Sequence, residues 1–480
     1  MDYSKIELKA GLEIHQQLNT HKLFCPCPSQ IKQDEPDFEI IRELRPLAGE
    51  LGEIDPAAIF ERKKKKHYIY EGYNDTTCLV ELDEEPPHPI NESALDIVLL
   101  IAKMLNCKFP DVVQVMRKTI INGSNVAGFQ RTALIGYDGF IETSFGKVGI
   151  QSIAIEEDAA RRIAEDSESV TYRLDRLGIP LIEIATAPDC KIPEQVKEVA
   201  ETLGMLLRST GKVMRGIGTI RQDINISVKG HPRIELKGVQ ELPQMPIIVM
   251  KEVERQLVAV NTKEKSVSHV RNILPDLSSK FLRPMPGSAR MYPETDIPLI
   301  ELNKTHIAKL KLPEPVEETK EKLKKLGLSS DLVNQLAGSE DISLFWKIHN
   351  SYKTLNAGQI ATTLLITPKE IKRKLQLKEF SPSEEAFSAI FTALRDKKIV
   401  KESITAILED IAKEKRALTL DVIDMIISCY KLLSESELKR EIEIIKKKFR
   451  NVPKEKLAGI AIGQLRGKAD PQKIITLLGK

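Results

Sequence analysis

Apolar side chains occupy every second position near the start of the chain, which predicts a β-strand with one buried face. The apolar positions of this strand are Ile6, Leu8, Ala10, Leu12 and Ile14. Glu13 and His15 share the opposite face. A carboxylate and an imidazole two residues apart suit a metal or nucleotide site, but an ordinary surface strand can carry the same short pattern.

Similar alternating segments recur up to Pro298, separated by glycine and proline. The clearest strands are expected at 148–156, 180–186, 219–228 and 233–239. Helices interrupt them, one beginning after the predicted N-cap Asn91 and another near Pro193. Strands mixed with helices, without a regular strand–helix–strand rhythm, predict an α+β domain built on an antiparallel sheet.

Beyond Pro298 helical periodicity replaces the alternation. Gly327 is the predicted C-cap of one helix. Two predicted capping boxes, Thr367–Glu370 and Ser381–Glu384, each place proline at the first helical position. The polar, weakly patterned segment 262–280 is expected to be a junction. The C-terminal part is therefore expected to consist of short helices.

The composition is that of an ordinary globular protein, with 41% hydrophobic and 29% charged residues. No apolar run is long enough to span a membrane, and the N-terminus lacks the hydrophobic region of a signal peptide. Six cysteines at irregular spacing do not form a disulfide framework. These features favour a cytoplasmic protein with no membrane partner.

Positive charge is concentrated at the C-terminus. The net charge is +3, whereas residues 439–480 contain twelve Lys or Arg and four Asp or Glu. This imbalance favours a polyanionic partner, and the alternative is a solvated helical surface.

A second group of carboxylates lies about 140 residues after the first strand. Residues 156–158 are Glu, Glu and Asp at the end of an apolar strand, and Glu183 stands alone in a β-rich run. Because a lone buried carboxylate is costly to desolvate, Glu183 requires a cation, a hydrogen-bonded partner or a metal. With Glu13, His15 and Glu157 it can form an oxygen-rich site that suits Mg²⁺ or Mn²⁺ better than zinc. The alternative is a set of salt bridges to Arg161, Arg162, Arg173 or Arg176.

Two further segments can contact a substrate. One predicted strand carries four polar residues on a single face, Arg221, Asp223, Asn225 and Ser227. They line either a pocket or the solvent side of an antiparallel sheet. The basic, glycine-containing segment 117–132 is similar to a phosphate-binding loop but matches no P-loop motif.

Cys25, Cys27 and Cys78 form an incomplete set of zinc ligands. His21, His67 or Asp75 would have to complete it. We therefore favour a local structural element over a structural zinc site.

Several longer motifs are specific enough to indicate a family. They are GLEIH with QLNT and KLFCPC (11–27), IEEDA (155–159), GIPLIEIATAPD (178–189), IRQDINIS (220–227) with ELKGVQEL, and GQLRGKADPQKIITLL (463–478). Together they resemble the B/E family of tRNA-dependent amidotransferase subunits, from the first strand to the last helix. The segments most similar to the family's archaeal E branch are 45–55, 70–87, 121–132 and 283–298.

The resemblance implies an ATP- and Mg²⁺-dependent reaction on glutamate attached to tRNA(Gln). Phosphorylation of the γ-carboxylate creates a leaving group, and ammonia from an asparaginase-like D subunit then displaces phosphate. No Ser-Lys or Thr-Lys nucleophile stands out in this chain, so a partner and a tunnel for ammonia are expected. The implied assembly is a heterotetramer of two D and two E subunits.

The resemblance also assigns roles to residues. The expected catalytic residues are Glu13, His15, Glu157 and Glu183. Of these, His15, Glu157 and Glu183 are expected to hold Mg²⁺. Nucleotide or substrate binding is expected from Asp158, Asp175, Arg176, Arg221, Asp223 and Asn225. Contacts to tRNA are expected from Lys446, Lys447, Lys448, Arg450, Arg466 and Lys468.

The implied fold is α+β, with a cradle-like catalytic domain over 1–298, a helical linker domain over 299–370 and a helical YqeY-like tail over 371–480. The E branch is expected to carry a large insert, similar to one in bacterial aspartyl-tRNA synthetase, just before the segment 283–298. Here the junction 262–280 bridges that point directly. Two other interpretations stay open: a B-type subunit of a three-subunit Asp/Glu-tRNA amidotransferase, and a non-catalytic tRNA-binding scaffold.

Overall fold

The computed structural model divides the chain into two units, residues 1–313 and 314–480. The described residues are 2–46, 48, 52–287, 290–339, 341–377, 380–414, 419–450, 452–465, 468–469 and 471–478. Each unit has its own hydrophobic core. Among the described residues, no helix is long and apolar enough to cross a membrane.

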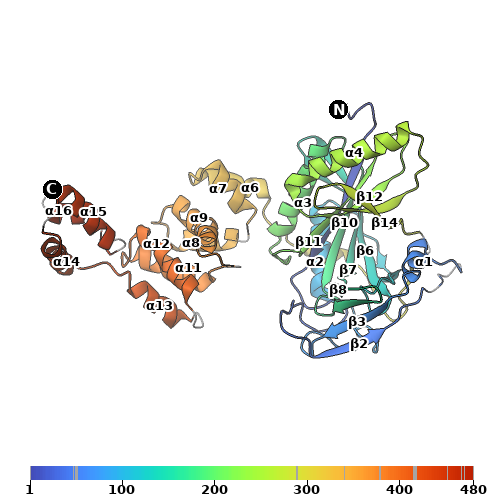
Figure 1. The fold of residues 1–480 in the computed structure, drawn as a ribbon, viewed down its shortest axis with the longest axis horizontal. Coiled ribbons are helices and arrows are strands. Elements are labelled where there is room, and N and C mark those ends of the chain that lie inside the picture. The colour runs from blue at the N-terminus through green and yellow to red at the C-terminus, as the bar shows by residue number, and fades with distance from the viewer. Residues whose placement is uncertain are drawn as a thin grey trace. The chain divides into compact units, whose positions relative to one another are not determined.

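The first unit is built on a ten-stranded sheet in the order β14-β13-β12-β11-β1-β10-β7-β6-β5-β15 (Figure 1). Its strands are β1 (Lys9–Gln17), β5 (Met116–Thr119), β6 (Phe129–Thr143), β7 (Gly146–Glu157), β10 (Pro180–Thr186), β11 (Ile220–Ser227), β12 (Ile234–Val239), β13 (His269–Ile273), β14 (Ser279–Pro284) and β15 (Met291–Pro293). The β12–β13 pair is parallel and the other neighbours are antiparallel. The predicted α+β class with a mainly antiparallel sheet is thereby confirmed.

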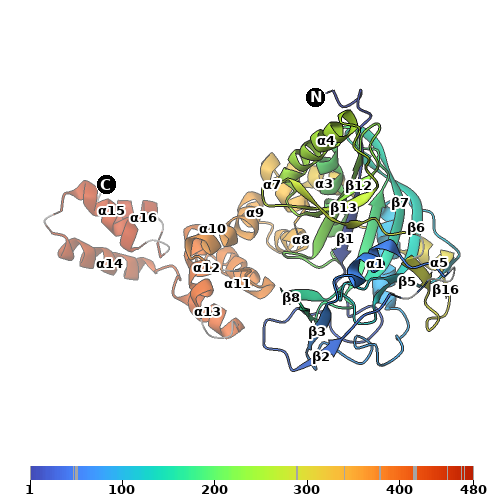
Figure 2. The same cartoon turned by 45° about the vertical axis from the view of Figure 1, so that its right-hand side comes forward.

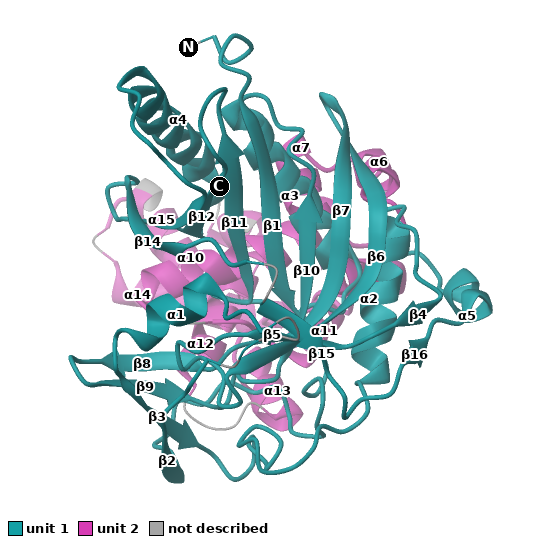
Figure 3. Ribbon diagram, turned by 90° about the vertical axis from the view of Figure 1, so that its right-hand side faces the viewer, with its two compact units in different colours: residues 1–313 teal, residues 314–480 magenta. Residues whose placement is uncertain are grey.

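Helices cover one face of this sheet. α2 (Glu92–Met104), α3 (Pro193–Ser209) and α4 (Met245–Asn261) bury their apolar sides in the main core. Figure 3 shows α2 and α3 behind the strands, which are seen from their other face. The predicted starts of two helices are confirmed, because the Asn91 side chain accepts from Ala94 N–H and Pro193 is the first residue of α3.

A smaller sheet lies at one end of the large one (Figures 1 and 2). Its order is β2-β3-β9-β8, with bounds β2 (Phe38–Arg42), β3 (His67–Gly72), β9 (Ser169–Arg173) and β8 (Arg161–Glu165). α1 (Pro56–Arg62) contacts β14 through an edge-to-face pair of Phe60 and Phe281. The remaining short elements of the unit are β4 (Val112–Val113), β16 (Ile300–Glu301), the 3₁₀ turn η1 (Leu242–Gln244) and α5 (Lys304–Lys309).

In the described part of the second unit, all regular structure is helical, which confirms the predicted helical C-terminal region. One core joins α6 (Val316–Lys325), α7 (Ser330–Ala337), α8 (Asp341–Ser351), α9 (Ala357–Leu365), α10 (Thr367–Lys374), α11 (Glu384–Arg395), α12 (Ile404–Lys413) and α13 (Leu420–Ser428). The short η3 (Lys401–Ser403) leads into α12. A separate core joins α14 (Glu435–Lys448), α15 (Lys454–Gln464) and α16 (Pro471–Leu478).

Three local predictions need correction. The segment 262–280 is not only a polar junction, because it carries β13 and the start of β14 at the edge of the large sheet. Both capping boxes are wrong: Thr367 is itself the first residue of α10, and the cap of α11 is Ser383. Gly327 does follow α6 with a positive φ of 79°, as a C-terminal glycine should.

Replacing Ile226 by alanine should lower the free energy of unfolding by about 2–5 kcal/mol, because it leaves a cavity in the main core. Ile226 is fully buried on β11. Urea unfolding of the whole chain measures the effect. The matched control is Ile217→Ala, which removes the same atoms from a fully exposed side chain and should change the stability by less than about 0.5 kcal/mol. Equal losses in the two variants would contradict this description of the core.

Candidate active site

Acidic side chains meet on the face of the large sheet that the helices leave open. Antiparallel pairing places His15 of β1 opposite Glu183 of β10, and Glu13 of β1 opposite Asp223 of β11. The same strands turn apolar residues into the core, because successive side chains alternate between faces. Buried Leu8, Ala10, Leu12 and Ile14 confirm the predicted apolar face of the first strand.

These side chains line a cavity of about 580 Å³ between the two sheets. Its acidic wall consists of Glu13, Glu156, Glu183, Asp223 and Glu235. Basic side chains line it too: Lys118, Lys237, Arg221, Arg283 and Arg290. The cavity therefore holds opposite charges within reach of a small charged ligand.

His15 is the centre of the acidic wall. Its Nε2 lies 3.2 Å from Glu183 Oε2 and 3.5 Å from Glu13 Oε1. Lys118 Nζ lies 3.4 Å from the same Glu183 oxygen and donates a hydrogen bond to Glu156. His15, Glu156 and Glu183 each offer a ligand atom within 4.8 Å of the others, and Glu13, His15 and Asp223 do the same.

A second lysine neutralises the other end of this wall. Lys237 Nζ lies 2.5 Å from Asp223 and 2.7 Å from Glu235. Burial lowers the pKa of Lys237, but the two carboxylates raise it by more, so the ammonium is retained. Each lysine thus bridges two carboxylates that would otherwise repel each other.

The pKa values of the central groups move apart. Burial and the charge of Glu183 raise the pKa of Glu13 to about 7. Burial also raises the pKa of Glu183, but Lys118 and His15 lower it by more, so Glu183 is ionised. Burial lowers the pKa of His15, but the hydrogen bond to Glu183 and the charges of Glu183, Glu13 and Glu156 together raise it by more, so the net shift is upward. Such divergent shifts among neighbouring groups are typical of functional sites.

The structure corrects the expected position of Glu157. Glu156 faces the cavity beside Lys118, whereas Glu157 lies on the core side of β7 with Ile153 and Ile155. Its carboxylate accepts a hydrogen bond of 3.0 Å from Arg131 N and lies 3.4 Å from the Arg131 guanidinium. The structure brings Glu13, His15 and Glu183 together as expected, but with Glu156 as their neighbour.

The alternation along β7 could have revealed this. If Ile153 and Ile155 face the core, then Glu157 shares their face and Glu156 does not. Lys118 lies in the segment 117–132 that was expected to be similar to a phosphate-binding loop, whereas Glu235 and Lys237 were not predicted as site residues. The place of each of these residues at the cavity depends on how the strands pair, which the local sequence pattern does not predict.

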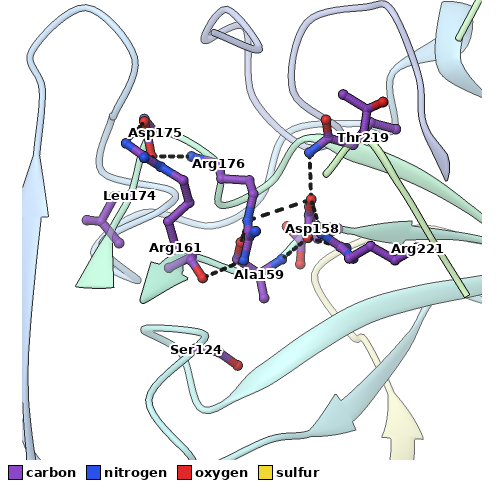
Figure 4. A network of polar contacts seen from close by, with 12 residues as sticks. Ser124, Asp158, Ala159, Arg161, Leu174, Asp175, Arg176, Thr219 and Arg221 are labelled. Carbon is purple, nitrogen blue, oxygen red and sulfur yellow. Dashed lines mark hydrogen bonds and ion pairs between the residues drawn. The ribbon is translucent and has the colours of Figure 1, made fainter. Parts of the chain in front are cut away.

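Asp158 and its arginines form a network beside the acidic wall (Figure 4). Asp158 accepts hydrogen bonds from Arg221 at 2.8 and 3.3 Å and from Gln17 at 2.7 Å. Arg176 Nε lies 3.8 Å from Asp158 and donates to Ala159 O at 2.7 Å. Burial raises the pKa of Asp158, but Arg221 and Arg176 lower it by more. Asp158 and Arg221 both line the cavity.

The other expected binding residues lie elsewhere. Asp175 is fully buried and forms an ion pair with Arg161, at 2.6 Å, next to the Asp158 network (Figure 4). Arg176 and Asp175 do not line the cavity. Asn225 is half-buried on β11 opposite Gly11, away from the cavity lining. Asp223 is part of the acidic wall itself.

The three cysteines meet around a carboxylate that was not predicted from the sequence. Cys25 Sγ donates to Glu81 Oε1 at 2.8 Å, and the Cys78 N–H donates to Glu81 Oε2 at 2.7 Å. Buried Lys22 lies 3.3 Å from the same group. Cys25, Cys27, Cys78 and Glu81 offer ligand atoms within 4.8 Å of one another, so the cluster could hold a metal ion.

Five of the six predicted tRNA-binding cations are described, and they lie on α14 or in the turns that follow α14 and α15. Exposed side chains are presented by Lys447, Lys448, Arg450 and Lys468. Lys446 is half-buried, and its Nζ lies 3.0 Å from Glu443. Arg466 lies outside the described residues. The exposed members are positively charged side chains of the kind that contact the phosphates of a polyanion.

Comparisons with known proteins agree along the chain. Residues 8–308 match the family model described as the GatB/GatE catalytic domain. A protein of Methanocaldococcus jannaschii, named as the E subunit of glutamyl-tRNA(Gln) amidotransferase, is 38% identical, and the alignment covers 100% of this chain and 99% of the relative. Proteins of the same name from Methanosarcina barkeri and Pyrobaculum islandicum are each 35% identical, and their alignments cover 98% of the relative and 100% and 99% of this chain.

The alignment with the Methanocaldococcus jannaschii protein spans 629 positions, 149 more than the 480 residues of this chain. The relative therefore contains segments that have no counterpart in this chain. This agrees with the expectation that the chain lacks an insert present in the E branch. The family model and the full-length relatives together show that the chain belongs to the GatB/GatE family.

Proposed function

We propose that the chain is the transamidating subunit of an enzyme that converts Glu-tRNA(Gln) to Gln-tRNA(Gln) with ATP. A γ-carboxylate oxygen of the tRNA-bound glutamate attacks the γ-phosphorus of ATP, and the bond from that phosphorus to ADP breaks. Ammonia then attacks the acyl carbon. The bond between this carbon and the phosphate oxygen breaks, phosphate leaves with that oxygen, and the nitrogen loses a proton to give the amide. The relatives named for this activity align over the full chain.

The observation that carries the proposal is the acidic wall around His15. Three side chains, His15, Glu156 and Glu183, supply one imidazole and two carboxylates, and one ligand atom of each lies within 4.8 Å of the others. Such a mainly oxygen donor set fits Mg²⁺ or Mn²⁺ and suits zinc less well. We propose that these three residues hold the divalent ion, which when bound offsets the charge of the phosphates. Glu156 takes the place first expected of Glu157.

The surrounding side chains complete the binding of two anionic reactants. Lys118, between Glu156 and Glu183, supplies a fixed ammonium at the same point. Arg221 faces the cavity and is oriented by two hydrogen bonds to Asp158. We assign Arg221 to phosphate binding and Asp158 to the positioning of Arg221. Asp175 and Arg176 then support the same network and do not contact the nucleotide.

Ammonia comes from a partner in this proposal. The partner is an asparaginase-like D subunit in a complex of two D and two E subunits, and a tunnel connects the two sites. The γ-phosphorylated intermediate is reactive toward water, so a direct path for ammonia protects it. The three-helix C-terminal core corresponds to part of the proposed YqeY-like tRNA-binding tail over 371–480, and the cavity to the proposed cradle over 1–298.

The cysteine cluster has a structural role in this account. Glu81 accepts hydrogen bonds from Cys25 and Cys78 and faces Lys22, so the cluster has internal partners of its own. A structural Zn²⁺ held by Cys25, Cys27, Cys78 and Glu81 is the alternative, and retention of zinc after dialysis would favour it.

Glu156→Gln should abolish the binding of Mn²⁺, because it removes one anionic ligand from the proposed site. Electron paramagnetic resonance of added Mn²⁺ measures free and bound metal directly. The matched variant Glu157→Gln changes the neighbouring residue, whose carboxylate faces the core, and should retain Mn²⁺ binding. If Glu157→Gln loses the metal and Glu156→Gln keeps it, the assignment of the ligands is wrong.

The isolated chain should form Gln-tRNA(Gln) from Glu-tRNA(Gln) with ATP and ammonium chloride. It should form none when asparagine or glutamine replaces ammonium, because the proposed ammonia-producing site is on the partner. Chromatography of the amino acid released from the tRNA measures both reactions. Product formation from an amide donor by the chain alone would contradict the two-subunit proposal, and the lack of any ammonium-dependent product would favour a non-catalytic scaffold.

Replacing Lys447 and Lys448 together by alanine should weaken tRNA binding and reduce its dependence on salt. Each lost phosphate contact should reduce the slope of log K against log salt by about 0.7–0.9. Filter binding at several salt concentrations measures the slope. The control is Lys304→Ala in the first unit, whose exposed side chain pairs with Asp111 and which should leave the slope unchanged. An unchanged slope in the double variant would exclude these two lysines from the tRNA contact.

A further inference from the structure

Two arginines of the cavity lining differ from its other cations. The described lining contains eight lysines and arginines, and six of them form ion pairs with carboxylates: Lys64, Lys66, Lys118, Arg162, Arg221 and Lys237. Among the residues that the structure describes, Arg283 and Arg290 form no ion pair, although both line the cavity. These two arginines therefore bring positive charge that no described carboxylate neutralises by direct contact.

Backbone contacts hold both arginines at the cavity. Arg283 lies on β14. Arg290 immediately precedes β15, and its Nε donates a hydrogen bond to Thr119 O at 3.2 Å. Between the two arginines in sequence, Gly287 N–H donates to the Asp55 carboxylate at 2.8 Å. Because β14 and β15 are the edge strands of the large sheet, the two arginines reach the cavity from positions on or next to its two edges.

The two guanidinium groups lie close enough to affect each other. Burial and the charge of Arg283 lower the pKa of Arg290, and the carboxylates around Arg290 raise it by less. An arginine nevertheless keeps its proton at neutral pH, so two like charges face the same cavity. An anion bound to both would offset their repulsion and replace water that the half-buried side chains have lost.

Arg290 lies beside the proposed metal ligands. Thr119, whose carbonyl group holds the Arg290 side chain, follows Lys118 in β5, and Lys118 donates a hydrogen bond to Glu156. The charge of Glu156 also acts on Arg290 directly. An anion held by Arg290 would therefore lie near the ion that binds the phosphates in the proposed function.

The proposed reaction brings two kinds of anion to this place: the phosphates of ATP and the γ-carboxylate of the glutamate on the tRNA. The divalent ion, Lys118 and Arg221 are already assigned to the phosphates, whereas no cation has been assigned to the γ-carboxylate. Guanidinium groups form strong, charge-assisted hydrogen bonds with carboxylates. The side-chain amide of glutamine has no negative charge and one oxygen fewer, so it should lose most of this interaction.

We propose that Arg283 and Arg290 bind the γ-carboxylate of the glutamate carried by tRNA(Gln) and thereby distinguish the substrate from the amidated product. The inference rests on the proposed function and extends it to recognition of the amino acid. Each carboxylate oxygen has two lone pairs, so an oxygen that accepts a hydrogen bond from a guanidinium can still attack phosphorus. Amidation removes the charge that the arginines bind, which favours release of Gln-tRNA(Gln).

Equilibrium binding of two tRNA analogues to the whole chain tests the role of these arginines without turnover. Both analogues are tRNA(Gln) with the amino acid attached through a stable 3′-amide, as glutamate in one and as glutamine in the other, and ATP is left out. The unmodified chain should bind the glutamate form about tenfold or more tightly than the glutamine form. Arg290→Gln and Arg283→Gln should each weaken the glutamate form and leave the glutamine form within about twofold, so the preference should largely disappear. Arg290→Lys keeps the charge without the planar fork and should retain part of the preference.

The matched control is Arg233→Gln, which changes an exposed arginine before β12 that does not line the cavity and should keep the full preference. Equal affinity of the unmodified chain for the two forms would overturn the inference, as would an unchanged preference in both glutamine variants. A tenfold loss of ATP binding in Arg290→Gln with the preference retained would also overturn it and assign this arginine to the phosphates. Failure of the proposed function is a separate outcome, since it would be seen as a lack of ATP-dependent amidation in the unmodified chain.

Discussion

The structure depends on holding five carboxylates together on one face of a sheet whose other face is the hydrophobic core. Two like charges 4 Å apart repel by about 4 kcal/mol at an effective dielectric constant of 20. The sheet meets this constraint with cations from its flanking strands: Lys118 of β5 bridges Glu156 and Glu183, and Lys237 of β12 bridges Asp223 and Glu235. The two lysines thus lie on strands to either side of the central strands β11, β1, β10 and β7 that carry most of the carboxylates. A divalent ion at His15 would continue the same compensation.

The fold brings these groups together from distant parts of the chain. Antiparallel neighbours place Glu13 of β1 between Glu183 of β10 and Asp223 of β11, although the three residues are far apart in sequence. The small sheet closes the other side of the cavity and holds the loop at residues 121–123 through its tyrosines. The large sheet thus supplies the acidic wall of the cavity, and the small sheet and the loop that it holds supply the opposite wall.

Local patterns predicted much of this arrangement, and long-range pairing decided the rest. The apolar face of β1, the N-cap Asn91, the helix start at Pro193 and the mixed α+β class followed from periodicity and from the rules for helix ends. Glu157 was expected at the site from the IEEDA motif and the family resemblance, whereas strand alternation turns its neighbour Glu156 to the cavity. The ion pairs of Lys118 with Glu156 and Glu183 and of Lys237 with Asp223 could not be predicted, because these partners lie on other strands. The polar segment 262–280 contains strand β13 because this strand pairs with β12. Local sequence propensity does not predict that pairing.

The central claim is that the γ-phosphoryl group of ATP is transferred, at the acidic wall, to the γ-carboxylate of the glutamate carried by tRNA(Gln). The most direct measurement incubates the whole chain with Glu-tRNA(Gln), Mg²⁺ and ATP radiolabelled at the γ-phosphorus, without ammonia. The account predicts label on the aminoacylated tRNA that is released as phosphate when ammonium is added, with Gln-tRNA(Gln) formed in equal amount. If labelled phosphate is released only into solution and never resides on the tRNA, the acyl-phosphate mechanism is contradicted.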